Sequence, residues 1–172
     1  MARQHPLTLL EEALEAWEDI RRGLIAEVEN IPADRFDFRP TPDTRRAGEL
    51  VRHILEVALM MVGELCRPET NLRRASFSEL LAAHNAPVRA AQSKEQLLAA
   101  LRTTFEEGQR RFRALGEDGI QRPMTRFDGK KGTRLAWMHH GLAHEEYHRG
   151  QLALYERLLG IKPALTRLID GG

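Results

Sequence analysis

Apolar residues recur at helical spacing along most of this chain, and this periodicity restricts the available folds more than any other feature. Four stretches carry aliphatic or aromatic side chains every three or four positions: residues 6–30, 44–67, 93–115 and 133–159. No segment convincingly alternates apolar and polar residues, as a half-buried strand would. The sequence therefore predicts an all-α protein whose 172 residues form a single domain, residues 1–172.

Proline, glycine and capping residues predict where the helices begin and end. Three prolines between residues 31 and 43 forbid a continuous helix there. Ser93, with Gln96 three residues later, forms a capping box that opens the third long helix. Gly116 is expected to end that helix, because glycine is the usual residue just past a helix C-terminus.

The connection between the second and third long helices is unusually long. It covers residues 68–92 and is expected to contain a short helix near residues 77–84. A polar loop over residues 117–132 leads to the fourth long helix, which should end before Gly160. These lengths predict a four-helix bundle with one long crossover between helices 2 and 3.

Charge, cysteine content and hydropathy exclude several classes of protein. The formal net charge is +1, with 26 Lys and Arg against 25 Asp and Glu, which is too balanced to predict a nucleic-acid partner. The single cysteine, Cys66, cannot form an internal disulfide, so a reducing compartment such as the cytoplasm is expected. No apolar run approaches the roughly 20 residues that span a bilayer, and the acidic N-terminus does not read as a signal peptide.

Two helices carry histidines at positions that suit metal binding. His144 and His148 are four residues apart, so both rings lie on one face of the fourth helix. His53 lies on the apolar side of the second helix, three residues after Leu50 and four before Val57. A single buried histidine is more often a hydrogen-bonded core residue, but bundle cores are where helical proteins build metal sites. Together the three predict a divalent metal ion bound by His53, His144 and His148.

Nearby polar residues are candidates for further roles. His140 would complete an i, i+4, i+8 ladder whose ends are about 12 Å apart, too far to converge easily on one ion, so it is expected beside the site. Glu56, one turn after His53, and Glu145 are weak candidates for catalytic residues that orient a ligand or move a proton. Ordinary surface glutamates are the alternative for both. A second alternative makes His140 or Glu56 a fourth ligand that closes the site.

The segment His144-Glu-Glu-Tyr-His148 also matches H-E-x-x-H, the signature of zinc metallopeptidases. In that interpretation Glu145 is the general base and a third ligand follows along the chain. Only 24 residues follow His148, and no strand pattern precedes the helix to align a peptide substrate. The peptidase is therefore kept as a minor alternative. It makes Glu145 face the metal and leaves His53 dispensable.

Two segments carry a resemblance to a known family. The run from His140 to Gly160, followed by Ile161-Lys-Pro163, resembles the C-terminal helix of the DinB-like superfamily. The proline-containing segment from Phe38 to His53, with its Gly-Glu-Leu-x-x-His pattern, resembles the entry to that family's second helix. The His-Arg-Gly-Gln element is the most specific part, and residues 67–115 carry little motif information.

The resemblance implies a four-helix bundle with a divalent ion, commonly zinc or nickel, on His53, His144 and His148. Members are often homodimers. Characterised relatives include thiol transferases that use low-molecular-weight thiols such as bacillithiol or mycothiol, and mycothiol-dependent maleylpyruvate isomerases; others are named metal-dependent hydrolases.

We therefore expect a metal-dependent enzyme of the thiol-transferase or hydrolase type, acting on a small-molecule substrate through a metal-activated thiol or water. Three neutral imidazoles leave the ion its full charge and an open position, which is typical of catalytic sites. The alternative is a metal-binding stress protein without catalysis.

Overall fold

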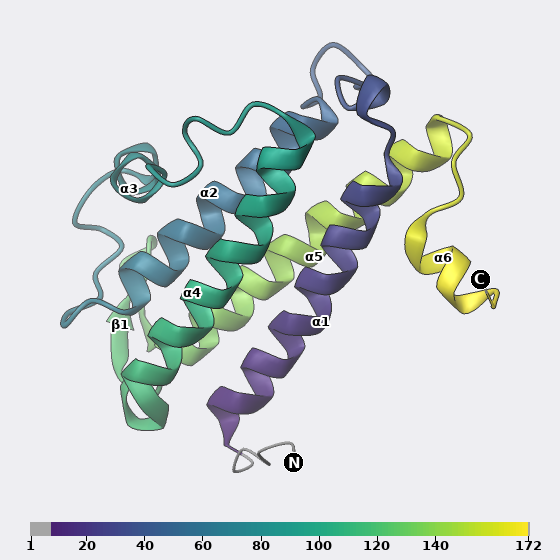
Figure 1. Cartoon of the computed structure of the whole chain (residues 1–172). Coiled ribbons are helices and arrows are strands. Elements are labelled where there is room, and N and C mark those ends of the chain that lie inside the picture. Colours follow the sequence, from purple (N-terminus) through teal and green to yellow (C-terminus); the bar gives the residue numbers. More distant parts are fainter. Residues whose placement is uncertain (1–7, 172) are drawn as a thin grey trace.

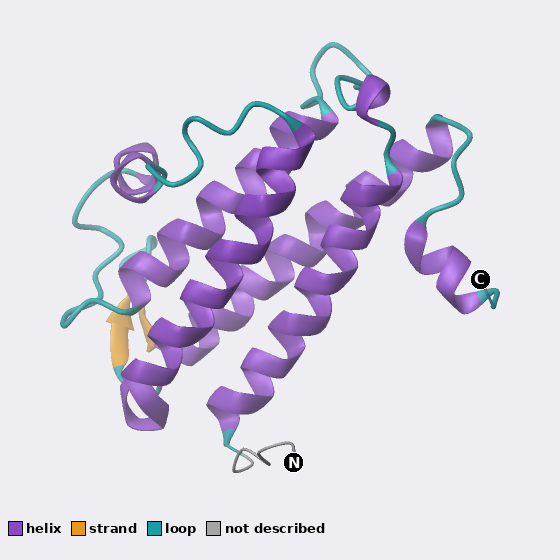
Figure 2. Ribbon diagram, viewed as in Figure 1, coloured by secondary structure: helices purple, strands orange, loops and turns teal. Residues whose placement is uncertain are grey.

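The computed structural model describes residues 8–171, which form six α-helices, a short 3₁₀ helix and a two-stranded hairpin (Figures 1 and 2). In chain order these are α1 (Leu9–Asn30), η1 (Ala33–Arg35), α2 (Ala47–Leu65), α3 (Phe77–His84), α4 (Lys94–Ile120), β1 (Pro123–Thr125), β2 (Lys131–Thr133), α5 (Arg134–Leu158) and α6 (Ala164–Ile169). The predicted all-α, four-helix architecture is confirmed. The predicted start of the first helix, at Pro6, lies outside the described residues.

The four long helices form a bundle in which α1 and α2 each pack against both α4 and α5. Helices α1 and α5 run parallel, since Arg21 meets Glu145 near their middles and Asn30 meets Glu156 near their C-terminal ends. Figure 1 shows α2 and α4 also running side by side in a common direction, opposite to that of α1 and α5. Two consecutive parallel helices need a connection that returns along the bundle, and this is the predicted crossover between the second and third long helices.

Two clusters of buried apolar side chains fill the bundle. One surrounds Trp17, whose ring packs edge-on against Phe105 and Phe112 at centroid distances of 4.9 and 6.0 Å. The other cluster lies toward the opposite end of the bundle and includes Ile54 and Leu152, both fully buried. Burying each such side chain stabilises the fold by roughly 1.5–3 kcal/mol, and the bundle supplies the rigid frame for any site between its helices. Within residues 8–171, no helix is both long and apolar enough to cross a membrane.

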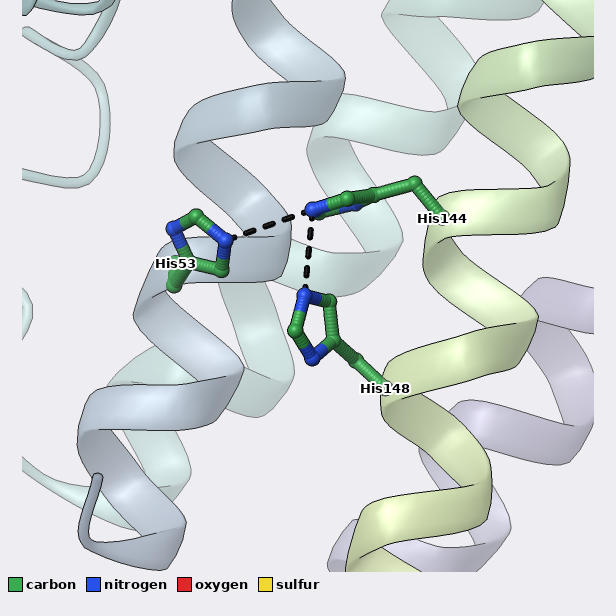
Figure 3. Close-up of side chains that lie close together, drawn as sticks. All are labelled: His53, His144 and His148. Carbon is green, nitrogen blue, oxygen red and sulfur yellow. Dashed lines mark hydrogen bonds between the residues drawn. The ribbon is translucent and has the colours of Figure 1, made fainter. Parts of the chain in front are cut away.

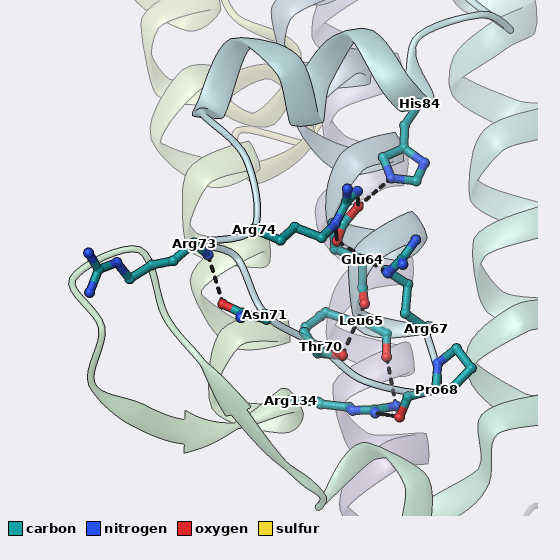
Figure 4. Close-up of polar contacts among 10 residues, drawn as sticks. All are labelled: Glu64, Leu65, Arg67, Pro68, Thr70, Asn71, Arg73, Arg74, His84 and Arg134. Atoms are coloured by element: carbon teal, nitrogen blue, oxygen red, sulfur yellow. Dashed lines mark hydrogen bonds and ion pairs between the residues drawn. The ribbon is translucent and has the colours of Figure 1, made fainter.

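A buried carboxylate, Glu64, anchors the crossover (Figure 4). Its oxygens accept hydrogen bonds from Arg74, with Nε at 2.9 Å, and contact His84 Nε2 at 2.7 Å, while Arg67 lies 3.8 Å away. Burial alone would raise the pKa of Glu64, but the hydrogen bonds from Arg74 and His84 hold it below its ordinary value. The carboxylate therefore ties α3, through His84, to the end of α2.

The same end of the bundle is closed by Arg134, at the first position of α5. Its guanidinium is buried and donates to the carbonyl oxygens of Leu65, at 3.0 Å, and Pro68, at 2.9 Å. Leu65 is the last residue of α2 and Pro68 lies just beyond it. Carbonyl groups at a helix C-terminus lack partners within the helix, so Arg134 supplies one. Arg134 thereby joins the start of α5 to the end of α2.

Three local features differ from the sequence expectations. Gly116 adopts φ 75° and breaks the helix as predicted, but four further residues resume helical structure and carry α4 to Ile120. The predicted polar loop after it contains the β1–β2 hairpin, in which Met124 pairs with Gly132. Three-residue strands are too short to show an alternating pattern in the sequence. The six-residue helix α6 is likewise too short for a detectable period.

Helix α6 docks onto the bundle through Glu27 of α1. The Glu27 carboxylate accepts hydrogen bonds from the backbone N–H groups of Ala164, at 2.7 Å, and Leu165, at 3.2 Å. Glu156 of α5 is fully buried near Glu27, and its Oε2 atom has no hydrogen-bond partner among residues 8–171. Burial, followed by the neighbouring Glu27 carboxyl group, raises the pKa of Glu156 to about 8, so Glu156 is protonated at neutral pH.

Replacing Glu156 with Gln removes this titration, so we expect the variant to become more stable than the wild type as pH rises. Between pH 4.5 and about 8, the folded wild type keeps a proton that the unfolded chain has already lost. The free energy of unfolding of the wild type therefore falls as pH rises through this range. The gain in Tm from pH 5 to pH 8 should be several degrees, because each pH unit between the two pKa values changes the free energy of unfolding by about 1.4 kcal/mol, and roughly 1 kcal/mol shifts the Tm of a chain of this size by about 2–4 °C. Thermal melts measure it, with the exposed Glu146→Gln as the control. An identical Tm difference at both pH values would contradict the raised pKa of Glu156.

Candidate metal centre

Three histidine rings converge between α2 and α5 (Figure 3). The Nε2 atom of His144 lies 3.2 Å from Nε2 of His53 and 3.1 Å from Nε2 of His148. One ring nitrogen from each residue fits within a group whose members are all within 4.8 Å of one another. Nitrogens bound at 2.0–2.1 Å to one tetrahedral zinc ion are about 3.3 Å apart, so two of the separations are close to those of a ligand set.

The helical spacing explains this convergence. His144 and His148 are separated by one turn of α5, which places both rings over the same face. That face meets α2, which runs antiparallel to α5, and His53 lies at the level of the two rings. The structure thus brings together the three histidines singled out from the sequence.

Gln151 fixes the orientation of one ring. Its side-chain oxygen lies 2.7 Å from Nδ1 of His148, at one turn along α5. With Nδ1 donating its proton to this oxygen, the lone pair of His148 is on Nε2, the atom that faces His144. An imidazole held in this way is the usual form of a metal-ligating histidine.

The rings are held neutral at physiological pH. Burial, followed by the nearby positive charge of Arg45, lowers the pKa of His53 to about 4. Burial, with smaller effects of the neighbouring histidines and Arg45, lowers the pKa of His144 to about 3. Burial also lowers the pKa of His148, against the opposing effect of its hydrogen bond to Gln151. Neutral imidazoles are the form that binds metal, so protons do not compete for the site at pH 7.

An open pocket of about 570 Å³ adjoins the histidines. His148 and its hydrogen-bond partner Gln151 line this pocket. The remaining walls come from α5, the start of α2 and the preceding loop: Asp43, Thr44, Arg45, Glu49, Leu50, Tyr147 and Tyr155. Gln151 and Tyr155 follow from helical spacing along α5. Arg45 could not be placed from the sequence, because residues 43–45 lie in an irregular segment whose path only the folded structure shows.

His140 and Glu56 lie outside the three-histidine group. The His140 ring is exposed and stacks on Trp137, with 4.5 Å between centroids and 23° between planes. His140 is one of the smaller causes of the low pKa of His144, after burial, His148 and His53. Glu56 is half-buried on α2, and the described residues offer its carboxylate no hydrogen-bond partner.

Glu145 points away from the histidines and toward α1. Its carboxylate, 2% exposed, accepts hydrogen bonds from Arg21 (Nε at 3.0 Å, Nη2 at 2.6 Å) and from Trp17 Nε1 at 2.9 Å. Both oxygens are therefore occupied within the bundle. The peptidase interpretation needs this carboxylate at the metal, so the geometry favours the bundle site, whose third histidine lies upstream on α2.

Comparison with known proteins agrees with this architecture. The family model described as the DinB superfamily matches residues 11–152. A DinB-like protein from Bacillus subtilis has 21% identity and a TM-score of 0.66, over 87% of this chain and 92% of its own. A protein from Exiguobacterium sibiricum, proposed to belong to the DinB family, has 20% identity and a TM-score of 0.64, over 90% and 95%.

A mycothiol-dependent maleylpyruvate isomerase is also similar in structure. Its identity to this chain is 13% and its TM-score 0.65, over 86% of this chain and 63% of the isomerase. At these identities the solved structures establish the fold alone. No curated protein sequence matches the chain.

Replacing Glu145 with Gln should weaken folding while sparing metal binding. The change leaves the buried Arg21 guanidinium without its counter-charge, which costs about 3–5 kcal/mol in buried pairs. Urea unfolding measures the loss of stability, and zinc titration below the unfolding transition measures binding. The adjacent, exposed Glu146→Gln is the matched control. Unchanged stability together with weakened zinc binding would contradict the structural role and support a metal-facing Glu145.

Proposed function

The chain belongs to the DinB superfamily, and on this basis we propose that it is a metal-dependent enzyme of the thiol-transferase or hydrolase type. The observation that carries the proposal is the group of three neutral imidazoles that face one another beside an open pocket. A set of three protein ligands with adjoining space is typical of catalytic rather than structural metal sites.

His53, His144 and His148 would hold the ion through their ring nitrogens. The donor set suits zinc or nickel, since imidazole is a good ligand for both. When bound, such an ion supplies Lewis acidity, which lowers the pKa of a water or thiol in the pocket. The likeness to a mycothiol-dependent isomerase supports a low-molecular-weight thiol as the co-substrate.

The chain's own residues contribute orientation and shape. Gln151 holds His148 in one tautomer and one ring position. Tyr155, buried in the bundle, donates through its hydroxyl to the backbone carbonyl of Arg45 at 2.9 Å and fixes the loop that forms the far wall of the pocket. Glu56, half-buried one turn beyond His53, would exchange a proton with a ligand of the ion, although Glu49 is the α2 carboxylate that lines the pocket itself.

Elemental analysis of reconstituted protein tests the metal site. We expect about one zinc or nickel ion per chain in the wild type and a small fraction of that in His53→Ala, because two imidazoles from one helix rarely complete a tight site. The control is His139→Ala, which removes an exposed histidine from α5. Full occupancy in His53→Ala would remove α2 from the site and revive the peptidase interpretation.

A further variant, His140→Ala, separates the catalytic proposal from a closed, non-catalytic site. If His140 were a fourth ligand, its removal would lower occupancy as His53→Ala does, and the enzyme proposal would be contradicted. For an open site, we expect His140→Ala to keep its metal. We also expect turnover in assays of thiol transfer to electrophiles or of ester hydrolysis.

A further inference from the structure

Arg45 carries a positive charge that the fold does not neutralise. It lies in the loop directly before α2, its side chain is exposed, and its guanidinium has neither a hydrogen bond nor an ion pair with any residue of the 8–171 segment. The next residue, Arg46, provides the contrast, since its guanidinium lies 3.6 Å from the carboxylate of Asp37. An unpaired arginine on a pocket wall is available to a ligand.

The backbone of Arg45 is nevertheless firmly placed. Its carbonyl oxygen accepts the hydrogen bond from Tyr155 of α5, two turns beyond His148. The Tyr155 ring packs edge-on against Phe38, at a centroid distance of 5.9 Å, and the Phe38 carbonyl accepts from the N–H of Ala47. A guanidinium with a fixed backbone and a free head loses little freedom when it binds an anion.

The position of Arg45 links it to the histidines. It shares the pocket wall with His148 and Gln151, and its charge is close enough to lower the pKa of all three ring systems. A molecule in this pocket therefore has both the Arg45 side chain and the ring of His148 on its walls.

The acidic residues on the pocket wall limit how much negative charge a ligand of Arg45 can carry. Glu49 accepts a hydrogen bond from the backbone N–H of Arg46 at 2.8 Å, so its carboxylate already serves the start of α2. Asp43, also on the wall, is exposed and adds a second negative charge. One guanidinium set among these acids suits a singly charged, planar carboxylate, which it can bind with two parallel hydrogen bonds, better than a phosphate dianion.

We propose that Arg45 is the specificity-determining residue of this pocket and binds the carboxylate of a small-molecule substrate whose other end reaches the histidine centre. The inference rests on the proposed function, because it takes the pocket as the substrate site of that centre.

Thiol binding to the cobalt-loaded protein tests this without any turnover assay. Visible absorption follows the binding of 2-mercaptoacetate, 3-mercaptopropanoate and 4-mercaptobutanoate, with 2-mercaptoethanol as the uncharged reference. In the wild type, at least one mercaptocarboxylate should bind about three- to tenfold more tightly than 2-mercaptoethanol, as expected for one charge-assisted contact at a partly exposed site. Arg45→Gln should abolish this preference, and the matched Arg46→Gln, which removes a charge one residue away, should keep it.

The outcomes separate the inference from the proposal beneath it. If the protein binds no cobalt, or if thiols leave the absorption of the bound cobalt unchanged, the proposed function is contradicted and the inference falls with it. Cobalt and thiols that bind without a carboxylate preference, or a preference that survives in Arg45→Gln, overturn the role of Arg45 alone. Stronger competition by inorganic phosphate than by acetate would overturn the assignment of a carboxylate.

Discussion

The buried ion pair between Arg21 of α1 and Glu145 of α5 sets the orientation of the helix that carries two of the three histidines. Successive residues of a helix are about 100° apart, so a side chain at position 145 that faces α1 leaves positions 144 and 148 on a different face. That face meets α2. Because α5 packs against both α1 and α2, one buried contact on the α1 side fixes which side chains reach the α2 side.

Several separate contacts, each modest by itself, hold the three histidines in a form and orientation that suit metal binding. Burial keeps the three imidazoles neutral, which costs nothing for ligation because the neutral ring is the ligand. The hydrogen bond from His148 to Gln151 selects a tautomer, and the loop before α2 is tied to α5 through Tyr155. The centre is therefore supported from both helices, while the pocket beside it stays open to a small molecule.

Much of this arrangement could be predicted from the sequence, because long helices carry a strong period. The short helix α3, expected near residues 77–84, spans Phe77–His84, and the i, i+4 spacing of His144 and His148 was sufficient to place both rings on one face. The hairpin and α6 were missed because segments of three and six residues contain too few repeats of a period for it to be detected. The partners of Glu145 and the position of Arg45 could not be predicted, since both depend on contacts between residues more than 100 positions apart.

X-ray absorption spectroscopy of the zinc-loaded protein tests the central claim most directly, because it reports the ligands of the ion itself. An open three-histidine centre predicts three imidazole nitrogens at about 2.0–2.1 Å and one exchangeable light atom, which a sulfur at about 2.3 Å replaces when a thiol is added. A shell of four protein ligands that does not change with thiol would contradict the account and identify a closed, non-catalytic site.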